Sequence, residues 1–369
     1  MDGMSLTTAA PGTQHADAAE RVRRACAAAT STRELLEAVG DITRAELGAD
    51  GSFVCTTDPV TALPNAEAVV VGLPDGMRYP WMRNEFIDDD LNKFGDLHAR
   101  RVPAATLHRA IADSGRESVR HHDVNRRFGF GHEIRAVFSQ NDACWGILNL
   151  VRVAGEPDFD DADLDFLAEI AEPVVEALRG LVLHRPTLGP ENVTPGVVML
   201  DPAGRVISLS DSARLLLDDL WLVPLEGGLD EVLPCQAYTV GWVATAQALG
   251  VRSPHSAVTR VQGVSGHWLT LRGTHAATEQ GDLMHIIVTI EPSRPDDILT
   301  MLSIAYNLTQ REQEVFAELR AGASIEETAA RMFISPHTLR AHMRSLFAKA
   351  GCSSRGELLS RLFVHRTGA

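Results

Sequence analysis

The sequence has few cysteines and no long apolar run. Its five cysteines, an odd number, form no Cys-x-x-Cys pair and are scattered from Cys26 to Cys352. This pattern argues against a disulfide scaffold and against a zinc site of the usual spacing, and it indicates a reducing compartment. No apolar stretch approaches the length that spans a bilayer. We therefore expect a cytoplasmic protein with no membrane partner.

Motifs for catalysis are also missing. The chain has no G-x-x-x-x-G-K-[ST] loop and no H-E-x-x-H pair, and 263–266 has the wrong spacing for a G-x-S-x-G elbow. His121, His122, Asp123 and His132 could suggest a metal, but a polar loop is the favoured interpretation. We expect no enzyme and identify no cofactor, and a ligand-processing activity has no residue set to recommend it.

Length and charge indicate several domains with different tasks. A chain of 369 residues exceeds one ordinary domain, and 45% hydrophobic residues suffice for sizeable cores. The net charge is −15, but residues 308–369 carry nine basic and six acidic side chains and are therefore positive. An acidic body with a mildly basic end is compatible with DNA binding that is confined to the end.

Two turn-rich, proline-containing stretches divide the chain, at 184–190 and 291–297. The predicted parts are a disordered tail (1–17), an α+β domain (18–184), a second α+β domain (191–292), a connector (296–307) and an all-α domain (308–369).

The C-terminal part contains dense helix-boundary signals. Capping boxes, in which Ser or Thr precedes Glu by three residues, are predicted at Thr309/Glu312, Ser324/Glu327 and Ser354/Glu357. Ser335 followed by Pro336 marks a further helix start. The signals predict four short helices at 309–321, 324–332, 335–350 and 354–363. Only two residues separate the second helix from the third, which predicts a helix-turn-helix.

The third of these helices has a basic outward stripe. His337, Arg340, Ala341 and Arg344 follow the i, i+3, i+4, i+7 spacing of one helix face. A helix fits the DNA major groove, where Arg can bond guanine O6 and N7 together. Ala341 leaves room for close approach, and Lys349 at the helix end suits a phosphate. A solvated charged face of an ordinary four-helix cap is the alternative.

The C-terminal part resembles the LuxR-type (LuxR/FixJ/NarL) DNA-binding domain. The resemblance is carried by Leu308–Val315 (LTQREQEV), Ile334–His342 (ISPHTLRAH) and Lys349–Gly351 (KAG). The resemblance covers about sixty residues. It implies that 335–350 is the recognition helix, that Arg340 touches DNA, and that Thr338, His342 and Lys349 lie at or near the DNA backbone. His342 could instead be a packed or capping histidine.

The first α+β domain is predicted to place helices around a short antiparallel sheet. The end of a GAF sensory domain resembles two segments of this part, Glu133–Phe138 (EIRAVF) and Cys144–Leu150 (CWGILNL), together with the long helix predicted after them at 163–183. A second resemblance, to the sensory half of actinobacterial LuxR-type regulators, is found at Trp81–Phe94. The resemblance implies a ligand pocket between sheet and helices. Its candidate lining residues, each of which could also be plain core, are Phe53, Trp81, Phe86, Phe138 and Trp145.

The second α+β domain resembles a PAS domain. Residues 194–209 predict strand, turn and strand, a helix is expected at 211–220, and further strands at 256–261, 268–273 and 284–290. A generic α/β connector is the alternative, partly because Ser210-Asp211 stands where PAS domains often have Asn.

These features predict a one-component transcription regulator. Its C-terminal helix-turn-helix would bind promoter DNA, and its GAF-like and PAS-like body would sense a small molecule of unknown identity or a partner. Two heads on adjacent half-sites imply a homodimer on DNA. The alternative is a sensor that acts mainly through protein contacts and has weak DNA affinity.

Overall fold

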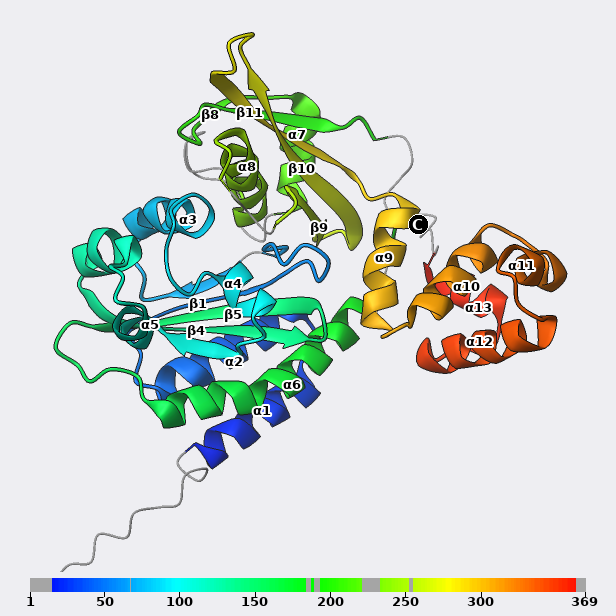
Figure 1. Cartoon of the computed structure of the whole chain (residues 1–369), viewed down its shortest axis with the longest axis horizontal. Helices are drawn as coiled ribbons and strands as arrows, with labels where there is room; N and C mark the ends of the chain where they lie inside the picture. The colour runs from blue at the N-terminus through cyan, green and yellow to red at the C-terminus, as the bar shows by residue number, and fades with distance from the viewer. Residues whose placement is uncertain are drawn as a thin grey trace, which may run out of the picture. The chain divides into compact units, whose positions relative to one another are not determined.

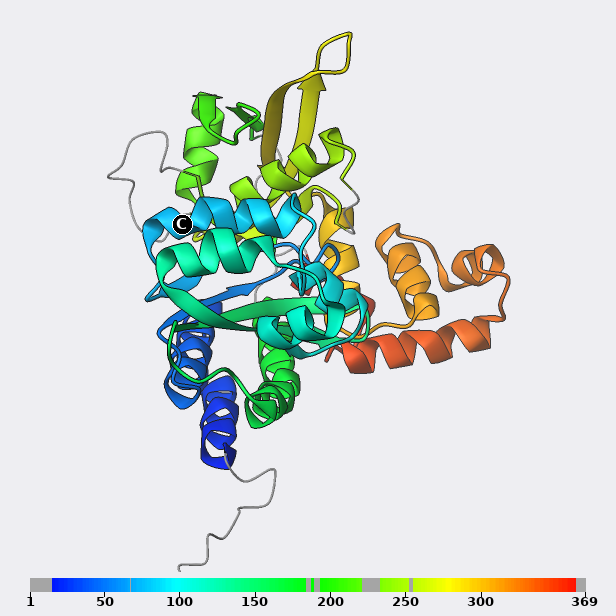
Figure 2. The same cartoon turned by 60° about the vertical axis from the view of Figure 1, so that its left-hand side comes forward.

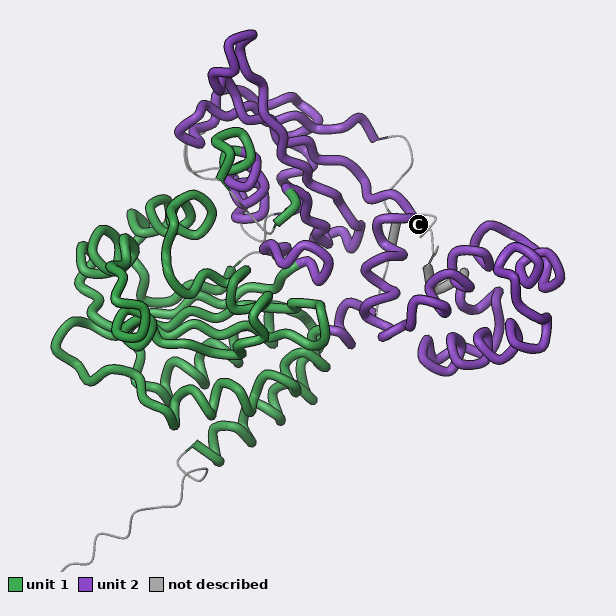
Figure 3. The backbone as a smooth tube through the Cα atoms, viewed as in Figure 1, with its two compact units in different colours: residues 1–57, 67–178, 245–256 green, residues 58–66, 179–244, 257–369 purple. Residues whose placement is uncertain are grey.

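The computed structural model describes residues 15–66, 68–183, 187–188, 193–220, 233–251 and 255–362. Contacts divide the chain into two compact units, each assembled from distant segments (Figure 3). Unit 1 contains 1–57, 67–178 and 245–256, and unit 2 contains 58–66, 179–244 and 257–369. Residues 1–14 of the predicted tail lie outside the described residues, but Ala16 and Asp17 belong to the first helix. The boundaries of the five parts expected from the sequence therefore remain a prediction.

Unit 1 is built on a five-stranded antiparallel sheet in the order β2-β1-β5-β4-β3 (Figure 1). Its strands are β1 (Gly51–Thr56), β2 (Val69–Val71), β3 (Ala104–Thr106), β4 (Phe130–Gln140) and β5 (Ala143–Val153). Its helices are α1 (Ala16–Ala28), α2 (Thr32–Glu46), α3 (Arg78–Phe86), α4 (Phe94–Ala99), α5 (Leu107–Ser114) and α6 (Asp161–Leu183), the last of which runs on into unit 2. Short 3-10 turns at Asp75–Met77 and Arg126–Phe128 and a π-helix at Arg120–Asn125 complete the unit.

The two faces of this sheet follow from strand periodicity, since successive side chains point to opposite faces. A side chain at Gly40 of α2 would contact Val54, so the even positions of β1 face α2. A side chain at Gly146 of β5 would contact Phe138 and Leu178, so this same face also meets α6. Phe53 contacts Trp81 of α3, which places α3 on the opposite face (Figures 1 and 2).

The predicted antiparallel sheet and the long helix predicted at 163–183 are both present in unit 1. The β4–β5 hairpin forms as expected, with Asn141 in its two-residue turn at φ 55°, a left-handed conformation that Asn tolerates better than most residues. Residues 104–106 pair with β4 as a strand, and α5 begins directly after them. The prediction did not include α3 or α4, whose mixed polar and apolar residues lack a clear helical period.

Unit 2 contains a six-stranded sheet in which β10 pairs with β6, β9 and β11. Its strands are β6 (Thr187–Leu188), β7 (Gly196–Leu200), β8 (Val206–Leu209), β9 (Val258–Gln262), β10 (His267–Ala277) and β11 (Leu283–Pro292), and its helices include α7 (Asp211–Asp218) and α8 (Cys235–Ala248). A Cβ at Gly273 would lie 2.2 Å from the carbonyl oxygen of Val240, so α8 packs on β10 at a distance that only glycine allows. The sequence prediction omitted α8.

A segment of unit 2 comes from between two strands of the unit 1 sheet. Residues 58–66 pack on β9, where the fully buried Asp58 accepts hydrogen bonds from the backbone N–H of Arg260 at 2.9 Å and from its guanidinium at 2.8 Å. Thr259 donates to the carbonyl oxygen of Pro64 at 3.1 Å. Burial raises the pKa of Asp58 even though Arg260 opposes that effect.

The C-terminal part of unit 2 is all-helical. Its helices are α9 (Pro295–Ala305), α10 (Gln310–Arg320), α11 (Ile325–Arg331), α12 (Pro336–Lys349) and α13 (Arg355–Leu362). The four predicted helices are confirmed to within two residues at each end. The stretch expected to be a connector is the helix α9, and its Ile298, Met301 and Leu302 share one hydrophobic cluster with Val315 and Phe316 of α10. The predicted multidomain class, α+β followed by an all-α end, is confirmed.

Candidate nucleic-acid interface

Side-chain caps determine where the C-terminal helices begin. The predicted capping boxes at Thr309/Glu312 and Ser324/Glu327 are both present, and each satisfies two backbone N–H groups that lack a partner in the helix. The third differs in detail. Ser354 Oγ accepts from the backbone N–H of Glu357 at 3.2 Å, but the Glu357 carboxylate accepts from the N–H of Ser353 at 2.8 Å.

The turn between α11 and α12 sets the direction of α12. Phe333 adopts φ 54°, and its N–H and that of Ile334 bond back to α11 carbonyl groups at 3.2 and 3.0 Å. Ser335 then caps α12 by accepting from the N–H of Thr338 at 3.1 Å. The inner face of α12 is anchored by Leu339 and Leu346, both fully buried. These contacts form a helix-turn-helix with α12 as its second helix.

The outward face of α12 carries the predicted stripe. His337, Arg340, Ala341 and Arg344 are all exposed. The Arg340 side chain is 55% exposed, and its single ion pair with a described residue is a loose one of 3.9 Å to Glu326. Arg344 forms no ion pair or hydrogen bond with any residue that the structure describes. Both guanidinium groups therefore keep their donors for a partner outside the molecule.

The flanking candidates have less freedom. Thr338 is exposed, and its hydroxyl lies 2.9 Å from that of Ser335 at the helix start. His342 is partly buried beside the stripe. Lys349 is paired within the domain, since its ammonium donates to Glu312 at 2.7 Å and to the Asn307 carbonyl at 3.0 Å. Its side chain is still 32% exposed, so one of its three donors remains for a phosphate.

Sequence reasoning identified Glu312 only as a cap, but this side chain also positions α12. Its carboxylate accepts from Thr309 N–H at 2.7 Å, Ser345 Oγ at 2.6 Å and Lys349 Nζ at 2.7 Å, so it joins the start of α10 to the last turns of α12. Burial alone would raise the pKa of Glu312, but the Lys349 and Ser345 bonds outweigh it and lower the pKa to about 2. Ser345 and Lys349 lie 33 and 37 positions after Glu312, so no local sequence pattern indicates these two contacts.

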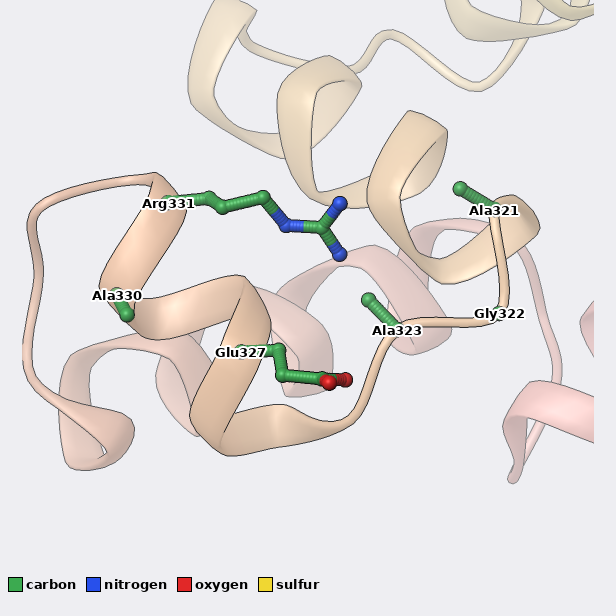
Figure 4. A pocket seen from close by; sticks show the side chains of 6 residues that line it. All are labelled: Ala321, Gly322, Ala323, Glu327, Ala330 and Arg331. Atoms are coloured by element: carbon green, nitrogen blue, oxygen red, sulfur yellow. The ribbon is translucent and has the colours of Figure 1, made fainter.

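A surface pocket lies on another side of the same domain (Figure 4). It is lined by Ala321, Gly322 and Ala323 of the loop that follows α10 and by Glu327, Ala330 and Arg331 of α11. The Arg331 guanidinium points across it and pairs with Glu318 at 2.9 Å. No residue of α12 lines this pocket, so it is separate from the basic stripe.

The aromatic candidates of unit 1 lie on both faces of its sheet. Phe53 and Trp81 lie together, with ring centroids 5.2 Å apart, and both are partly buried. Phe86 is buried on the same helix as Trp81, and its ring lies 6.2 Å from that of His255. Phe138 is on the opposite face of the sheet, and Trp145 is 2% exposed near the start of β5. Phe53 and Trp81 are thus the two candidates whose rings lie in contact, and the ligand-binding role of all five stays a prediction.

Two further findings concern classes of function. Among the described residues, no three His, Cys, Asp or Glu side chains are close enough to hold a metal ion, and His132 instead pairs with Asp158 at 3.3 Å. Within the same part of the chain, every helix is too short or too polar to cross a membrane.

Residues 306–362 match the family described as bacterial regulatory proteins, luxR family. The CsgBAC operon transcriptional regulatory protein of Escherichia coli is 42% identical over 53 residues, which are 14% of this chain and 24% of that protein. The transcriptional regulatory protein UhpA of Escherichia coli is 39% identical over 56 residues, or 15% of this chain and 29% of UhpA. The matches thus span less than a third of these relatives. They support a LuxR-family helix-turn-helix domain at residues 306–362.

Similar solved structures include SdiA in complex with octanoyl-rac-glycerol, at 11% identity and a TM-score of 0.35, covering 94% of this chain and 96% of that one. Another is the GAF domain/HD domain protein from Geobacter sulfurreducens, at 15% identity and a TM-score of 0.30, covering 41% and 93%. Both likenesses are weak, and the description of the fold rests on the structure of this chain itself.

Proposed function

We propose that this chain is a one-component transcription regulator that binds double-stranded DNA through the outward face of α12. The observation that carries the proposal is the stripe of His337, Arg340, Ala341 and Arg344, exposed on a helix whose other face is anchored in a hydrophobic cluster. An α-helix fits the major groove, and a free guanidinium fork matches the two acceptors of guanine. The LuxR-family match of the same segment supports the same assignment.

Control of DNA binding is assigned to the α+β body. A small molecule or partner that favours one conformation of the body would change how two heads are presented to DNA. Two heads on one duplex require half-sites about one helical turn apart, so the proposed active form is a homodimer on DNA in the cytoplasm. The GAF-like and PAS-like labels of the two sheets belong to this proposal.

The test replaces one arginine of the stripe and one outside it. DNA fragments are first selected from a random duplex library by the full-length protein. Arg340→Ala is expected to weaken binding to the selected sequence by roughly 5- to 150-fold and to relax the preference at one base pair. Arg311→Ala is the matched control, because Arg311 is 57% exposed on α10 and pairs only locally with Glu314 at 2.7 Å. It is expected to change affinity by less than about threefold.

Salt dependence separates this function from a sensor that acts through protein contacts. Direct binding should weaken steeply between about 50 and 200 mM salt, because Lys and Arg displace counterions from the phosphates. If library selection enriches no sequence and binding at low salt is unaffected by Arg340→Ala, the DNA-reading assignment is wrong.

A further inference from the structure

A row of side chains crosses the sheet of unit 1 on the face that α3 covers. Phe53 of β1 pairs with Asn149 of β5, and Asn149 pairs with Arg135 of β4. Residues that are paired directly across neighbouring strands point to the same face. The row therefore runs from the partly buried Phe53 to the 1% exposed Arg135, with the fully buried Asn149 between them.

Arg135 uses two of its three nitrogens. Nε donates to Glu133 at 3.0 Å and to the Asn149 side-chain oxygen at 3.2 Å. Nη1 donates to Glu85 at 2.6 Å and to the Asn92 carbonyl at 3.3 Å. The guanidinium also lies 4.6 Å from the centroid of the Phe94 ring and 5.0 Å from that of the Trp81 ring. Nη2 is buried and has no hydrogen-bond partner among the described residues.

Asn149 supplies a second unused donor next to it. A guanidinium can only donate, so the amide oxygen of Asn149 must face Arg135, and the amide nitrogen is the atom that is left over. This Nδ2 is also buried and unpaired within the described part of the chain. Buried donors without partners are costly and uncommon in native proteins. Two of them, on groups already bonded to each other, indicate a place for an external acceptor.

The surrounding carboxylates are already occupied. Glu133 accepts from both Arg120 and Arg135, and Glu85 accepts from Arg135 and from the Phe94 backbone N–H. Asp90 accepts from Asn84 and from the N–H groups of Leu91 and Arg120. Three carboxylates therefore face two guanidinium groups. An anionic ligand would add to this buried negative excess, and a cationic ligand would meet the two free donors, so both are disfavoured.

We propose that Arg135 Nη2 and Asn149 Nδ2 hold the carbonyl oxygen of an uncharged small ligand whose flat body lies against the rings of Phe53 and Trp81. Phe53 and Trp81 are only partly buried, whereas Arg135 and Asn149 are buried, so the proposal has the ligand enter past the two rings. The inference deepens the sensing part of the proposed function, since it names the chemistry of the signal and the residues that receive it.

The experiment measures binding of three probes of one shape to the full-length protein. Benzamide carries a neutral carbonyl, benzoate an anion and benzylamine a cation. Each is titrated to about 20 mM, a range suited to fragments of this size, with saturation-transfer NMR as readout. Benzamide is expected to bind at least about tenfold more tightly than the other two. No benzamide binding, or equal binding of all three probes, overturns the proposal.

Asn149→Asp tests the donor itself. The Asp side chain keeps an oxygen for Arg135 Nε but replaces the free donor with an acceptor, so benzamide affinity is expected to fall at least about tenfold. Asn141→Asp is the matched control, because it makes the same change at an exposed turn of the same hairpin and should leave affinity unchanged. Unchanged benzamide binding in Asn149→Asp overturns the proposal. If that variant does not fold, Trp81→Leu replaces it, with the same expected loss and the same overturning result.

None of these readouts involves DNA. A protein that binds benzamide at this site but ignores all DNA would refute the proposed function and leave the site standing. A protein that reads DNA through α12 but discriminates none of the three probes would refute the proposed ligand site and leave the proposed function standing.

Discussion

Arginine has opposite surroundings in the two regions that matter most in this molecule. Arg340 on α12 is 55% exposed and its nearest carboxylate is 3.9 Å away. Arg135 on β4 is 1% exposed and bonds two carboxylates at 2.6 and 3.0 Å. An exposed fork with only this loose ion pair can be offered almost whole to a partner such as DNA. A buried fork is largely used by the fold, so only its remaining nitrogen is free for a ligand.

The largest expected effect comes from breaking the buried network. Glu133→Gln keeps the shape of the side chain but removes the charge shared by Arg120 and Arg135. Burial alone would raise the pKa of Glu133, but the two arginines outweigh it and lower the pKa, so the native group is ionised. The change should lower the free energy of unfolding by roughly 3–5 kcal/mol, because it removes the carboxylate that pairs with Arg120 and one of the two that pair with Arg135. Urea denaturation followed by circular dichroism measures this.

The exposed pair Arg101–Asp142 is the control for that measurement. Its side chains are 76% and 91% exposed, with a distance of 2.9 Å. Arg101→Ala should cost less than about 1 kcal/mol. Equal losses in Glu133→Gln and Arg101→Ala would remove the distinction between buried and exposed arginines on which the comparison depends.

The next effect is the acid sensitivity of α12. The pKa of Glu312 is lowered from 4.5 to about 2, so ionised Glu312 stabilises the fold above pH 4.5, and this stabilisation is lost as the pH falls through 2. A shift of this size corresponds to roughly 3 kcal/mol. At pH 6 we expect the free energy of unfolding of the unsubstituted protein to exceed that of the Glu312→Gln variant by about this amount. This difference in free energy should shrink as the pH is lowered toward 2. Amide hydrogen exchange of α12 at each pH reports it, and a constant difference would contradict the role of the ionised carboxylate.

A smaller effect is expected at the second arginine of the stripe. Arg344→Ala removes a side chain that has no partner among the described residues, so stability should change by less than about 0.5 kcal/mol. Affinity for the selected DNA should fall by about 1–3 kcal/mol, measured by fluorescence anisotropy. Loss of stability without loss of affinity would assign Arg344 to the fold and not to the interface.

The smallest effect concerns Lys349, whose ammonium is partly used by the fold and partly exposed for a partner. We expect Lys349→Met to reduce the slope of log affinity against log salt concentration by about one, because one phosphate contact is lost. Arg311→Ala should leave the slope unchanged. If the slope also stays constant in Lys349→Met, the ammonium serves only Glu312 and Asn307.

Much of the C-terminal helical part could be predicted because its signals are local. A cap joins residues three positions apart, and an apolar stripe repeats within one helix, so Thr309, Ser324 and Ser335 identify the helix starts without knowledge of the fold. The spacing of His337, Arg340 and Arg344 likewise determines which face they share. The helices α3 and α8 were not predicted, because neither has a periodic apolar face that distinguishes helix from loop.

The ligand candidates show where prediction from sequence ends. Aromatic residues could be picked from the chain, but nothing local separates Phe53 from Phe138, which lie on opposite faces of one sheet. The polar partners were not singled out at all. Arg135, Asn149 and Glu85 come from separate strands and a helix, and they meet only after β4, β5 and α3 have packed.

The sequence alone determined the helical boundaries of residues 308–362, the exposed basic face within them and the alternation of strand residues, because each depends on neighbours within about one or two turns. Tertiary structure decided which charges were buried together. Asp58 bonds Arg260 across 202 positions and Glu312 bonds Lys349 across 37. Such pairs depend on strand register and helix packing, and many registers are compatible with the same local pattern. Packing selects one of them and so determines which arginines remain free.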